Sequence, residues 1–255
     1  MYEIILVIVG AVMAKLAEYA LDAYRRRKTE AASPTVTGIE DVLRWGWDGE
    51  ALLRRLIALD RSLIGDCLTA EREGTVAQWA PVFMAHPEMW ILLTTGPKQI
   101  VGYWQLAALD DNTFGRALTG ELLDSEITLD TVEPIDVPGI YNLYIVLLGV
   151  SPDCPNGLLK LIDAFKDRIE SLARRGIFFR AVCANAFTKD GKHLCEGFGM
   201  IEIGPHKDFG TVYYLPLYPW PKRLVYKRWQ EVKDHYEQAF SDELADNRPP
   251  PCSEP

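Results

Sequence analysis

The sequence lacks the signatures of several common protein classes. Its five cysteines form no C-x-x-C pair and its four histidines stand at no zinc-site spacing, so we expect no metal site. Basic residues are scarce: 27 Lys and Arg against 36 Asp and Glu give a formal net charge of −9, which disfavours nucleic acid as the main ligand. No internal repeat is present. The acidic balance instead favours a cationic partner, such as an amine.

A hydrophobic segment is present at the N-terminus. Ile4–Ala14 is an unbroken apolar run, helical character continues through residue 24, and the basic cluster Arg25–Lys28 follows at once. We expect residues 1–28 to form a hydrophobic helix that anchors the protein in a membrane, because residues 4–24 are long enough to cross a bilayer. The basic cluster would hold the remainder in the cytoplasm. No small-residue cleavage site follows, which favours an anchor over a removed signal.

Three charged residues, Lys15, Glu18 and Asp22, argue against a membrane anchor, because they share one face of the predicted helix. The alternative is an interfacial or partner-binding amphipathic helix on a cytoplasmic protein. The expected organisation of the chain is an N-terminal helix at 1–28, a linker at 29–38, one domain at 39–220, an amphipathic C-terminal helix at 221–241 and a disordered tail at 242–255.

The body of the chain predicts a mixed α/β fold. Its first part has helical periodicity, and a strand–helix–strand unit follows later, which implies a right-handed crossover between neighbouring parallel strands. The expected strands are Met89–Thr94, Ile100–Leu109, Tyr141–Val150, Ile177–Ala184, Met200–Ile203 and Phe209–Leu215. The helix after the central strand, from Leu158 to Leu172, begins where free backbone N–H groups and the helix dipole favour an anion such as a pyrophosphate.

Three phrases of the sequence resemble motifs of the GNAT acyltransferase superfamily. Ile100–Trp104 (IVGYW) is similar to the family's I-V-G strand, and Val150–Asp153 (VSPD) to the V-x-P that ends its fourth strand. Asn185 with Gly191–Met200 (GKHLCEGFGM) resembles its N…L-Y-E-x-x-G-F/M segment. The resemblance covers about residues 40–218. It implies a GNAT-like mixed central β-sheet flanked by helices, and acyl transfer from acetyl-CoA or another acyl-CoA.

The resemblance also implies a set of cofactor-binding residues. In the family, the fourth strand binds the pantetheine arm, the following turn binds the pyrophosphate and the next strand contributes an Asn. The corresponding positions here are Leu147, Leu148, Gly149 and Val150 for the pantetheine, Pro155, Asn156, Gly157, Leu158 and Leu159 for the phosphate turn, and Asn185. The turn departs from the family pattern, because only Gly157 of its glycines is kept and no Arg or Gln precedes it.

The catalytic candidates come from the same comparison and from the acidic stretch at 110–138. Cys195 occupies the position of a family Tyr that protonates the leaving thiolate, and the alternative is a small buried hydrophobe. A general base could be Glu126 or another acidic residue of this stretch. The alternative is that the stretch is a solvated loop. Tyr141 and Tyr144 lie on opposite faces of the central strand, so one of them should face the cofactor cleft. The acidic candidates are Asp124, Glu126, Glu133 and Asp136.

The function expected from these observations is acyl-CoA-dependent N-acylation, most simply acetylation, of a small-molecule or protein amine in a ternary complex. The alternatives are a membrane-tethered non-catalytic binding module with the GNAT fold, a protein-modifying toxin or effector, and an unrelated α/β enzyme without a split sheet. The aromatic face of Trp229, Tyr236 and Phe240 predicts either core packing or a homodimer contact.

Overall fold

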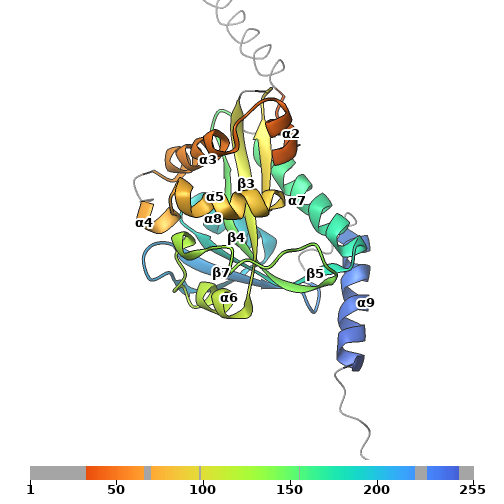
Figure 1. Cartoon of the computed structure of the whole chain (residues 1–255). Helices are drawn as coiled ribbons and strands as arrows, with labels where there is room; N and C mark the ends of the chain where they lie inside the picture. The colour runs from red at the N-terminus through yellow and green to blue at the C-terminus, as the bar shows by residue number, and fades with distance from the viewer. Residues whose placement is uncertain (1–32, 66–69, 98, 155, 222–228, 247–255) are drawn as a thin grey trace, which may run out of the picture.

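The computed structural model describes residues 33–65, 70–97, 99–154, 156–221 and 229–246 (Figure 1). In this part of the chain, one seven-stranded sheet has the order β1-β2-β3-β4-β5-β7-β6. Its neighbours are antiparallel except for β4 and β5, which are parallel and joined through α7. The neighbouring parallel strands expected from the strand–helix–strand pattern are therefore confirmed.

The strands are β1 (Thr35–Gly38), β2 (Trp90–Thr94), β3 (Ile100–Leu109), β4 (Gly139–Val150), β5 (Ile177–Ala186), β6 (Ile201–Pro205) and β7 (Thr211–Pro216). The helices are α2 (Ile39–Arg44), α3 (Gly49–Ile64), α4 (Ala70–Glu73), α5 (Val76–Ala85), α6 (Asp111–Leu118), α7 (Gly157–Arg174), α8 (Lys189–Phe198) and α9 (Gln230–Asp246), with short 3-10 turns η1 (Pro87–Met89) and η2 (Asp124–Glu126).

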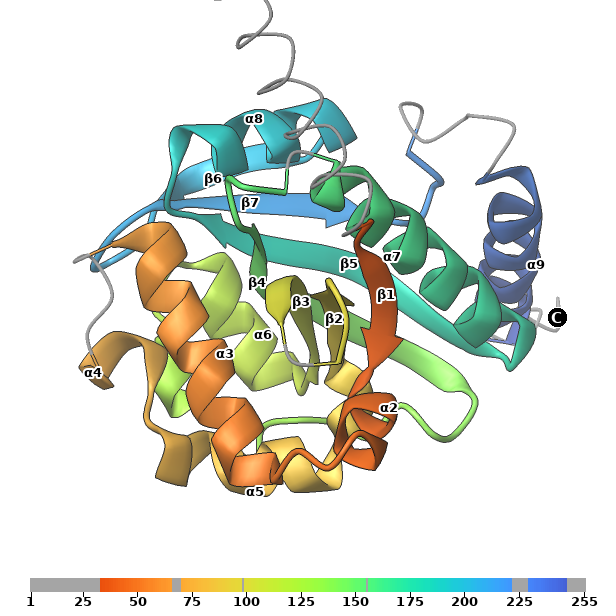
Figure 2. The same cartoon turned by 90° about the horizontal axis from the view of Figure 1, so that it is seen from above.

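Helices cover both faces of the sheet (Figure 2). One hydrophobic cluster joins α3, α5 and α6 to one face, and a second joins α7 and α9 to the other. Adjacent β3 residues divide between the two clusters, with Tyr103 in the first and Trp104 in the second. This alternation is the period of two that a strand buried on both faces requires.

Local sequence signals fix the ends of the helices near the site. Asp48 caps α3 by accepting the N–H of Ala51, and Gly65, at φ +80°, follows its last residue. Thr188 caps α8 by accepting the N–H of Gly191, and Gly199, at φ +78°, ends that helix. These are the N-cap and left-handed C-terminal positions that favour Asp, Thr and Gly.

The centre of the sheet is irregular at β4. Gln105 of β3 pairs with Leu147, but the next residue, Leu106, pairs with Ile145, so Val146 is an additional residue that forms a β-bulge. The pairing of β4 with β5 ends at Ile145 and Ala184, whereas β4 continues along β3 to Val150. The β5-facing edge of residues 146–150 therefore has no strand partner in the described sheet.

Two boundaries differ from expectation. Residues 35–38, expected in a linker, form β1, which pairs with β2 through residues 91–94. The acidic stretch at 110–138 is not a continuous solvated loop, because it contains α6 and η2, and Phe114 and Ala117 of α6 are buried. Asp110 caps α6 through the N–H groups of Asn112 and Thr113.

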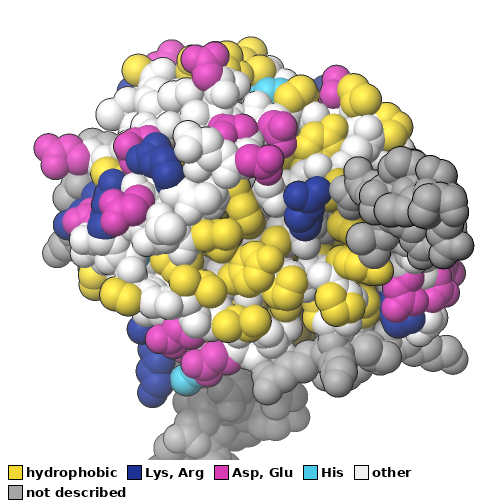
Figure 3. All heavy atoms as spheres, turned by 90° about the horizontal axis from the view of Figure 1, so that it is seen from below, with side chains coloured by type: hydrophobic (Ala, Val, Ile, Leu, Met, Phe, Trp, Pro, Cys, Tyr) yellow, Lys and Arg dark blue, Asp and Glu magenta, His cyan; other side chains and the backbone are white. Residues whose placement is uncertain are grey.

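The C-terminal helix is an integral part of the core. Trp229, Tyr236 and Phe240 are buried in the second cluster, so core packing, one of the two alternatives for this aromatic face, is confirmed. The hydroxyl of Tyr236 accepts the backbone N–H of Phe179 at 3.1 Å. On the face of the molecule in Figure 3, hydrophobic side chains gather in the middle among charged ones.

Among the described residues, no helix is long and apolar enough to cross a membrane. The expected anchor at 4–24 lies outside those residues. The tail expected at 242–255 begins too early, because residues 242–246 belong to α9; residues 247–255 lie outside the described part of the chain.

Candidate functional site

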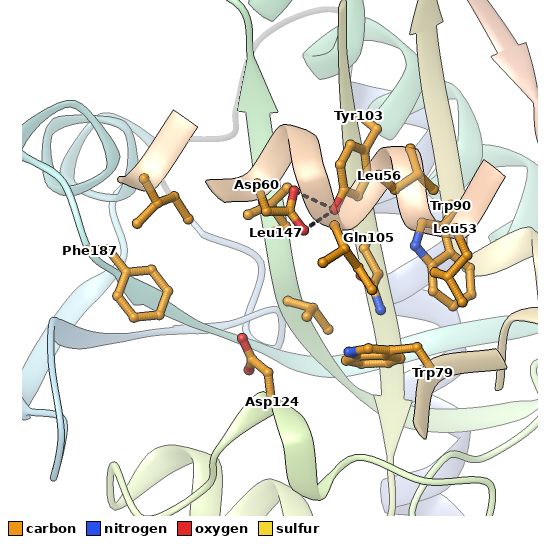
Figure 4. Close-up of a pocket in the computed structure, with 13 residues that line it drawn as sticks. Leu53, Leu56, Asp60, Trp79, Trp90, Tyr103, Gln105, Asp124, Leu147 and Phe187 are labelled. Carbon is orange, nitrogen blue, oxygen red and sulfur yellow. Dashed lines mark hydrogen bonds between the residues drawn. The ribbon is translucent and has the colours of Figure 1, made fainter. Parts of the chain in front are cut away.

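A cavity with about 460 Å³ of empty space, open in part to solvent, lies between α3, α5 and the bulged part of β4 (Figure 4). We call it the acidic cavity, because two aspartates contribute to a wall that is otherwise largely apolar. Its lining residues are Leu53, Leu56, Ile57, Asp60, Ile64, Trp79, Trp90, Tyr103, Gln105, Asp124, Val146, Leu147 and Phe187.

Each aspartate of the acidic cavity accepts a hydrogen bond from a buried tyrosine of the sheet. Tyr103 donates its hydroxyl proton to the carboxylate of Asp60, and Tyr144 donates to Asp124 at 3.0 Å. Burial and the nearby Asp124 carboxylate raise the pKa of Tyr144 well above its ordinary value, so its hydroxyl keeps the proton it donates. These bonds orient both carboxylates.

The cavity also contains a polar group without a partner. Gln105 is 5% exposed, and its Nε2 has no hydrogen-bond acceptor in the structure. In Figure 4 this nitrogen points to the same side of β3 as Trp79 and Asp124. A buried amide N–H without an acceptor is destabilising, and a ligand that brings an acceptor removes the cost.

A second hollow lies across the sheet, between α7, α8 and the C-terminal segment. We call it the apolar groove; it has about 700 Å³ of empty space, including open solvent, and no polar exposed surface. Its lining residues are Trp104, Ile145, Leu148, Leu161, Ile162, Phe165, Ile169, Val182, Phe198, Met200, Leu215, Leu217, Trp220 and Trp229.

The strand residues expected to hold the pantetheine lie where these two hollows meet the unpaired edge of β4. Leu147 lines the acidic cavity and Leu148 lines the apolar groove. A Cβ at Gly149 would come within 2.5 Å of a δ-methyl of Leu63, so that side chain would have to shift. Val150 ends the strand opposite Gly102 of β3. The structure therefore brings these four residues to one open strand edge.

The turn expected to bind phosphate is only partly available. The N–H of Gly157 donates to Cys154 at 2.9 Å, and a Cβ at Gly157 would come within 2.5 Å of Leu93, so this glycine is required for packing. Asn156 does not cap α7 with its side chain, which leaves the first turn, with Leu158 and the exposed Leu159, without a described side-chain cap. Residue 155 lies outside the described residues.

Asn185 supports a neighbouring turn. Its Nδ2 donates to the carbonyl oxygen of Phe209 at 3.0 Å, and its Oδ1 is buried without a partner. Asn185 lines a smaller hollow that shares Asp124 and Phe187 with the acidic cavity. It therefore lies on the acidic side of the sheet.

Glu126 does not line the acidic cavity. It pairs with Arg116 at 2.7 Å and accepts the N–H of Leu123 at 2.8 Å, with Lys207 at 3.7 Å. Partial burial alone would raise its pKa, but these donors outweigh it and the pKa of Glu126 is lowered. A carboxylate held in an ion pair is a poor proton acceptor, and Asp124 is the member of the acidic stretch that lines the cavity.

The other two catalytic candidates also lie outside the cavity lining. Cys195 is the buried residue of α8 and packs against Ala184, Ala186 and Tyr213; burial raises the pKa of its thiol to about 11. Tyr141 donates its hydroxyl to the carbonyl oxygen of Val137 near the start of β4. Tyr144 does not line the cavity either, but its hydroxyl donates to Asp124, which does.

Sequence reasoning missed Asp60, Tyr103 and Gln105. Asp60 lies on the amphipathic helix α3, whose pattern indicates only that one face packs on the core. The sequence position of Asp60 gives no sign that it contacts a distant strand. Gln105 did carry a signal, because it is the single amide side chain within the apolar run Ile100–Leu109. A polar residue that interrupts a strand buried on both faces requires a partner or a ligand.

No family model matches the chain, and no curated protein matches it. Among solved structures, 64 chains match. An acetyltransferase from Thermus thermophilus is 16% identical, with a TM-score of 0.41 over 72% of this chain and 97% of that one. A GNAT-family acetyltransferase from Staphylococcus aureus is 11% identical, with a TM-score of 0.44 over 72% and 99% of the two chains.

A third match is the AtaTR structure bound with acetyl-CoA, which is 12% identical with a TM-score of 0.42 over 74% of this chain and 96% of that one. With TM-scores below 0.5, these matches carry no argument about this chain, whose described residues form a mixed seven-stranded sheet flanked by helices.

Proposed function

We propose that the protein is an N-acyltransferase that moves an acyl group, most simply acetyl, from acyl-CoA to an amine. The observation that carries this proposal is the open edge of β4. Beyond Ile145 the strand separates from β5, and the bulge at Val146 turns its backbone between the two hollows. An extended pantetheine arm could pair with this edge as a strand would, because its amides match backbone hydrogen-bonding groups.

The first turn of α7 is the proposed site of the pyrophosphate. It lies directly after β4, its N–H groups at Leu158 and Leu159 have no described side-chain cap, and α7 is an 18-residue helix whose dipole favours an anion. Lys160 is held elsewhere, by the carbonyl oxygen of Pro34 and the hydroxyl of Ser33. The site would thus depend on backbone groups.

The acidic cavity is the proposed acceptor site. The ammonium group of the acceptor transfers one proton to the carboxylate of Asp124, and the neutral nitrogen forms a bond to the thioester carbonyl carbon. Backbone N–H groups at Leu148 and Gly149 would stabilise the oxyanion. The C–S bond then breaks, and the thiolate of CoA takes the second proton from nitrogen, directly or through water.

Thermal unfolding of the full chain with acetyl-CoA, and separately with longer acyl-CoAs, tests the donor site. Saturation at about 100 times Kd adds about 2.7 kcal/mol, or about 5–10 °C in Tm for a domain of this size. The sharper test is Leu159→Glu compared with Leu159→Gln. A carboxylate at this exposed position favours the helix N-terminus but repels a pyrophosphate, so only the Glu variant should lose acetyl-CoA affinity, by at least tenfold, without loss of Tm.

A non-catalytic binding module is the second candidate. It is favoured by the phosphate turn, since the N–H groups of Cys154 and Gly157 are already bonded within the loop at 2.9 Å. If no acyl-CoA raises the Tm of the folded chain, the transferase proposal is wrong and this reading replaces it. If acyl-CoA binds and Leu159→Glu has no effect, the pyrophosphate is not at α7.

A further inference from the structure

The apolar groove reaches the edge of β4 that has no strand partner in the described sheet. In a regular strand, residues three apart point to opposite faces, but Ile145 and Leu148 both line the groove. The β-bulge at Val146 shifts the alternation by one residue and brings Leu148 to the face of Ile145. Ile145 is the last residue of β4 that pairs with β5. The wall of the groove therefore runs from the closed part of the sheet to its open edge.

The groove presents only hydrocarbon and aromatic surface to a ligand. The described residues that line it expose no polar atom, and the indole N–H of Trp104 is buried away from the groove surface. A molecule that enters therefore meets no exposed hydrogen-bonding group, so a polar group would lose its contacts with water and gain none. Each CH2 group that leaves water for such a site increases affinity about fourfold. The groove thus favours an aliphatic chain.

The size of the groove limits the length of that chain. The groove encloses a volume of about 60 Å³ for water-sized groups. One water molecule needs about 10–15 Å³ on the same measure, so the groove holds about four to six groups of this size. A CH2 group in a chain takes up a similar volume. The space therefore suits about four to six carbons, whereas the methyl group of acetyl would leave most of it empty.

The position of the groove relates it to the acyl group of the proposed donor. A pantetheine arm that pairs with the open edge of β4 would bring its thioester against residues 146–150, and Leu148 of this segment lines the groove. An acyl chain attached to that thioester would need no separate entrance, because it could extend directly from the strand edge past Leu148 and Ile145.

We propose that the acyl donor is a medium-chain acyl-CoA, whose unbranched saturated chain of about six carbons lies in the apolar groove. This inference rests on the proposed function, because it names the donor of the same site. It commits the groove to one occupant of defined chemistry and length, which can be varied one carbon at a time.

The first test compares acetyl-CoA, hexanoyl-CoA and dodecanoyl-CoA by calorimetric titration of the full chain without an acceptor. Hexanoyl-CoA has four more carbons than acetyl-CoA, so it should bind at least 20-fold more tightly. Dodecanoyl-CoA should bind no more tightly than hexanoyl-CoA, since its additional carbons would remain in water. Equal binding of acetyl-CoA and hexanoyl-CoA, or a further large gain with dodecanoyl-CoA, would overturn the inference.

Ile162→Trp tests the location of the chain. Ile162 is half-buried on α7 and lines the groove, so an indole ring at this position would fill the space. The variant should bind acetyl-CoA as the unaltered chain does, while its preference for hexanoyl-CoA should fall below threefold. Ile203→Trp is the matched control, because Ile203 is exposed on β6 outside the groove, and it should retain the preference. A preference that Ile162→Trp leaves intact at matched Tm would contradict the proposed location.

Phe198→Ala provides a second variant that does not depend on filling the groove. Phe198 is half-buried at the end of α8, and its truncation enlarges the groove. The tightest donor should therefore change from hexanoyl-CoA to octanoyl-CoA or decanoyl-CoA, and an optimum that stays at hexanoyl-CoA would count against the inference. A protein that binds acetyl-CoA but gains nothing from a longer chain would retain the proposed function and lose this donor class. A folded protein that binds no acyl-CoA of any length would lose the proposed function itself.

Discussion

The two faces of the central strands differ sharply, although adjacent residues supply them. Trp104 and Gln105 of β3 point to opposite sides, and each has a buried N–H without an acceptor. Around Gln105 are carboxylates held by tyrosines. Around Trp104 are only apolar side chains, including Phe165, whose ring meets it edge-on with centroids 4.7 Å apart. One face is therefore suited to chemistry and the other to packing and apolar contact.

The β-bulge at Val146 separates two parts of one strand that have different surroundings. Before Val146 the sheet is continuous, and after it β4 pairs with β3 alone while its side chains enter two unlike environments. A charged acceptor and an apolar or extended donor could meet at the strand between them. Changes on the apolar face should then affect stability and the preferred acyl chain, whereas changes on the acidic face should affect rate.

The largest expected effect is on stability, from Trp229→Ala. Trp229 is 8% exposed and packs near Trp220, with ring centroids 6.1 Å apart, at one end of the apolar groove. Loss of a buried Trp side chain should lower the free energy of unfolding by about 3–5 kcal/mol, measured by chemical denaturation. The kcat of the folded fraction, with a saturating acyl-CoA and an acceptor amine, should not change. A parallel loss of kcat would contradict the separation of the two faces.

The next effect is on rate, from Asp124→Asn. With a saturating acyl-CoA and an acceptor amine, kcat should fall about 100-fold, equivalent to about 2.7 kcal/mol, because proton acceptance by a positioned group is worth that order of magnitude. Glu126→Gln is the informative control, since Glu126 lies in an ion pair outside the cavity. If kcat fell equally in the two variants, Asp124 could not be assigned as the base in preference to Glu126.

A smaller effect depends on pH. Burial raises the pKa of the Cys195 thiol to about 11 from about 9, so the folded state favours the neutral thiol. This contribution to stability is present below pH 9 and is lost as the pH rises from 9 to 11, because the unfolded chain ionises first. The free energy of unfolding should fall across this window, and less steeply in Cys195→Ala. Identical slopes would show that this thiol is not held neutral by the fold.

The smallest effect is expected from Trp104→Phe. The substitution removes an unpartnered buried N–H from the apolar face but keeps an aromatic ring, so we expect the free energy of unfolding to change by less than about 1 kcal/mol. Differential scanning calorimetry of this variant beside Gln105→Leu compares neighbouring positions directly. If the free energy of unfolding fell by several kcal/mol, the N–H of Trp104 would have to make a hydrogen bond, which would contradict the description of the apolar face.

Much of the fold could be predicted from the sequence, and much of the site could not. The hairpin of β2 and β3, the long strand β4 and the helix α7 follow from hydrophobic period and turn residues. β1 was missed because four residues of polar and small side chains carry no period, and only pairing with β2 defines them. The acidic cavity was missed because its groups come from elements far apart in sequence, which only the topology of the sheet brings together.

The hydrogen bond between the hydroxyl of Tyr236 and the backbone N–H of Phe179 predicts how the protein responds to truncation at its C-terminus. The acceptor of an N–H in the interior of β5 is supplied by a helix that begins after every strand has been completed. A chain ended before α9 would retain all seven strands yet leave that N–H buried, or open it to water, in the middle of the sheet. The fold therefore requires α9, and we expect a chain without this helix to be unfolded.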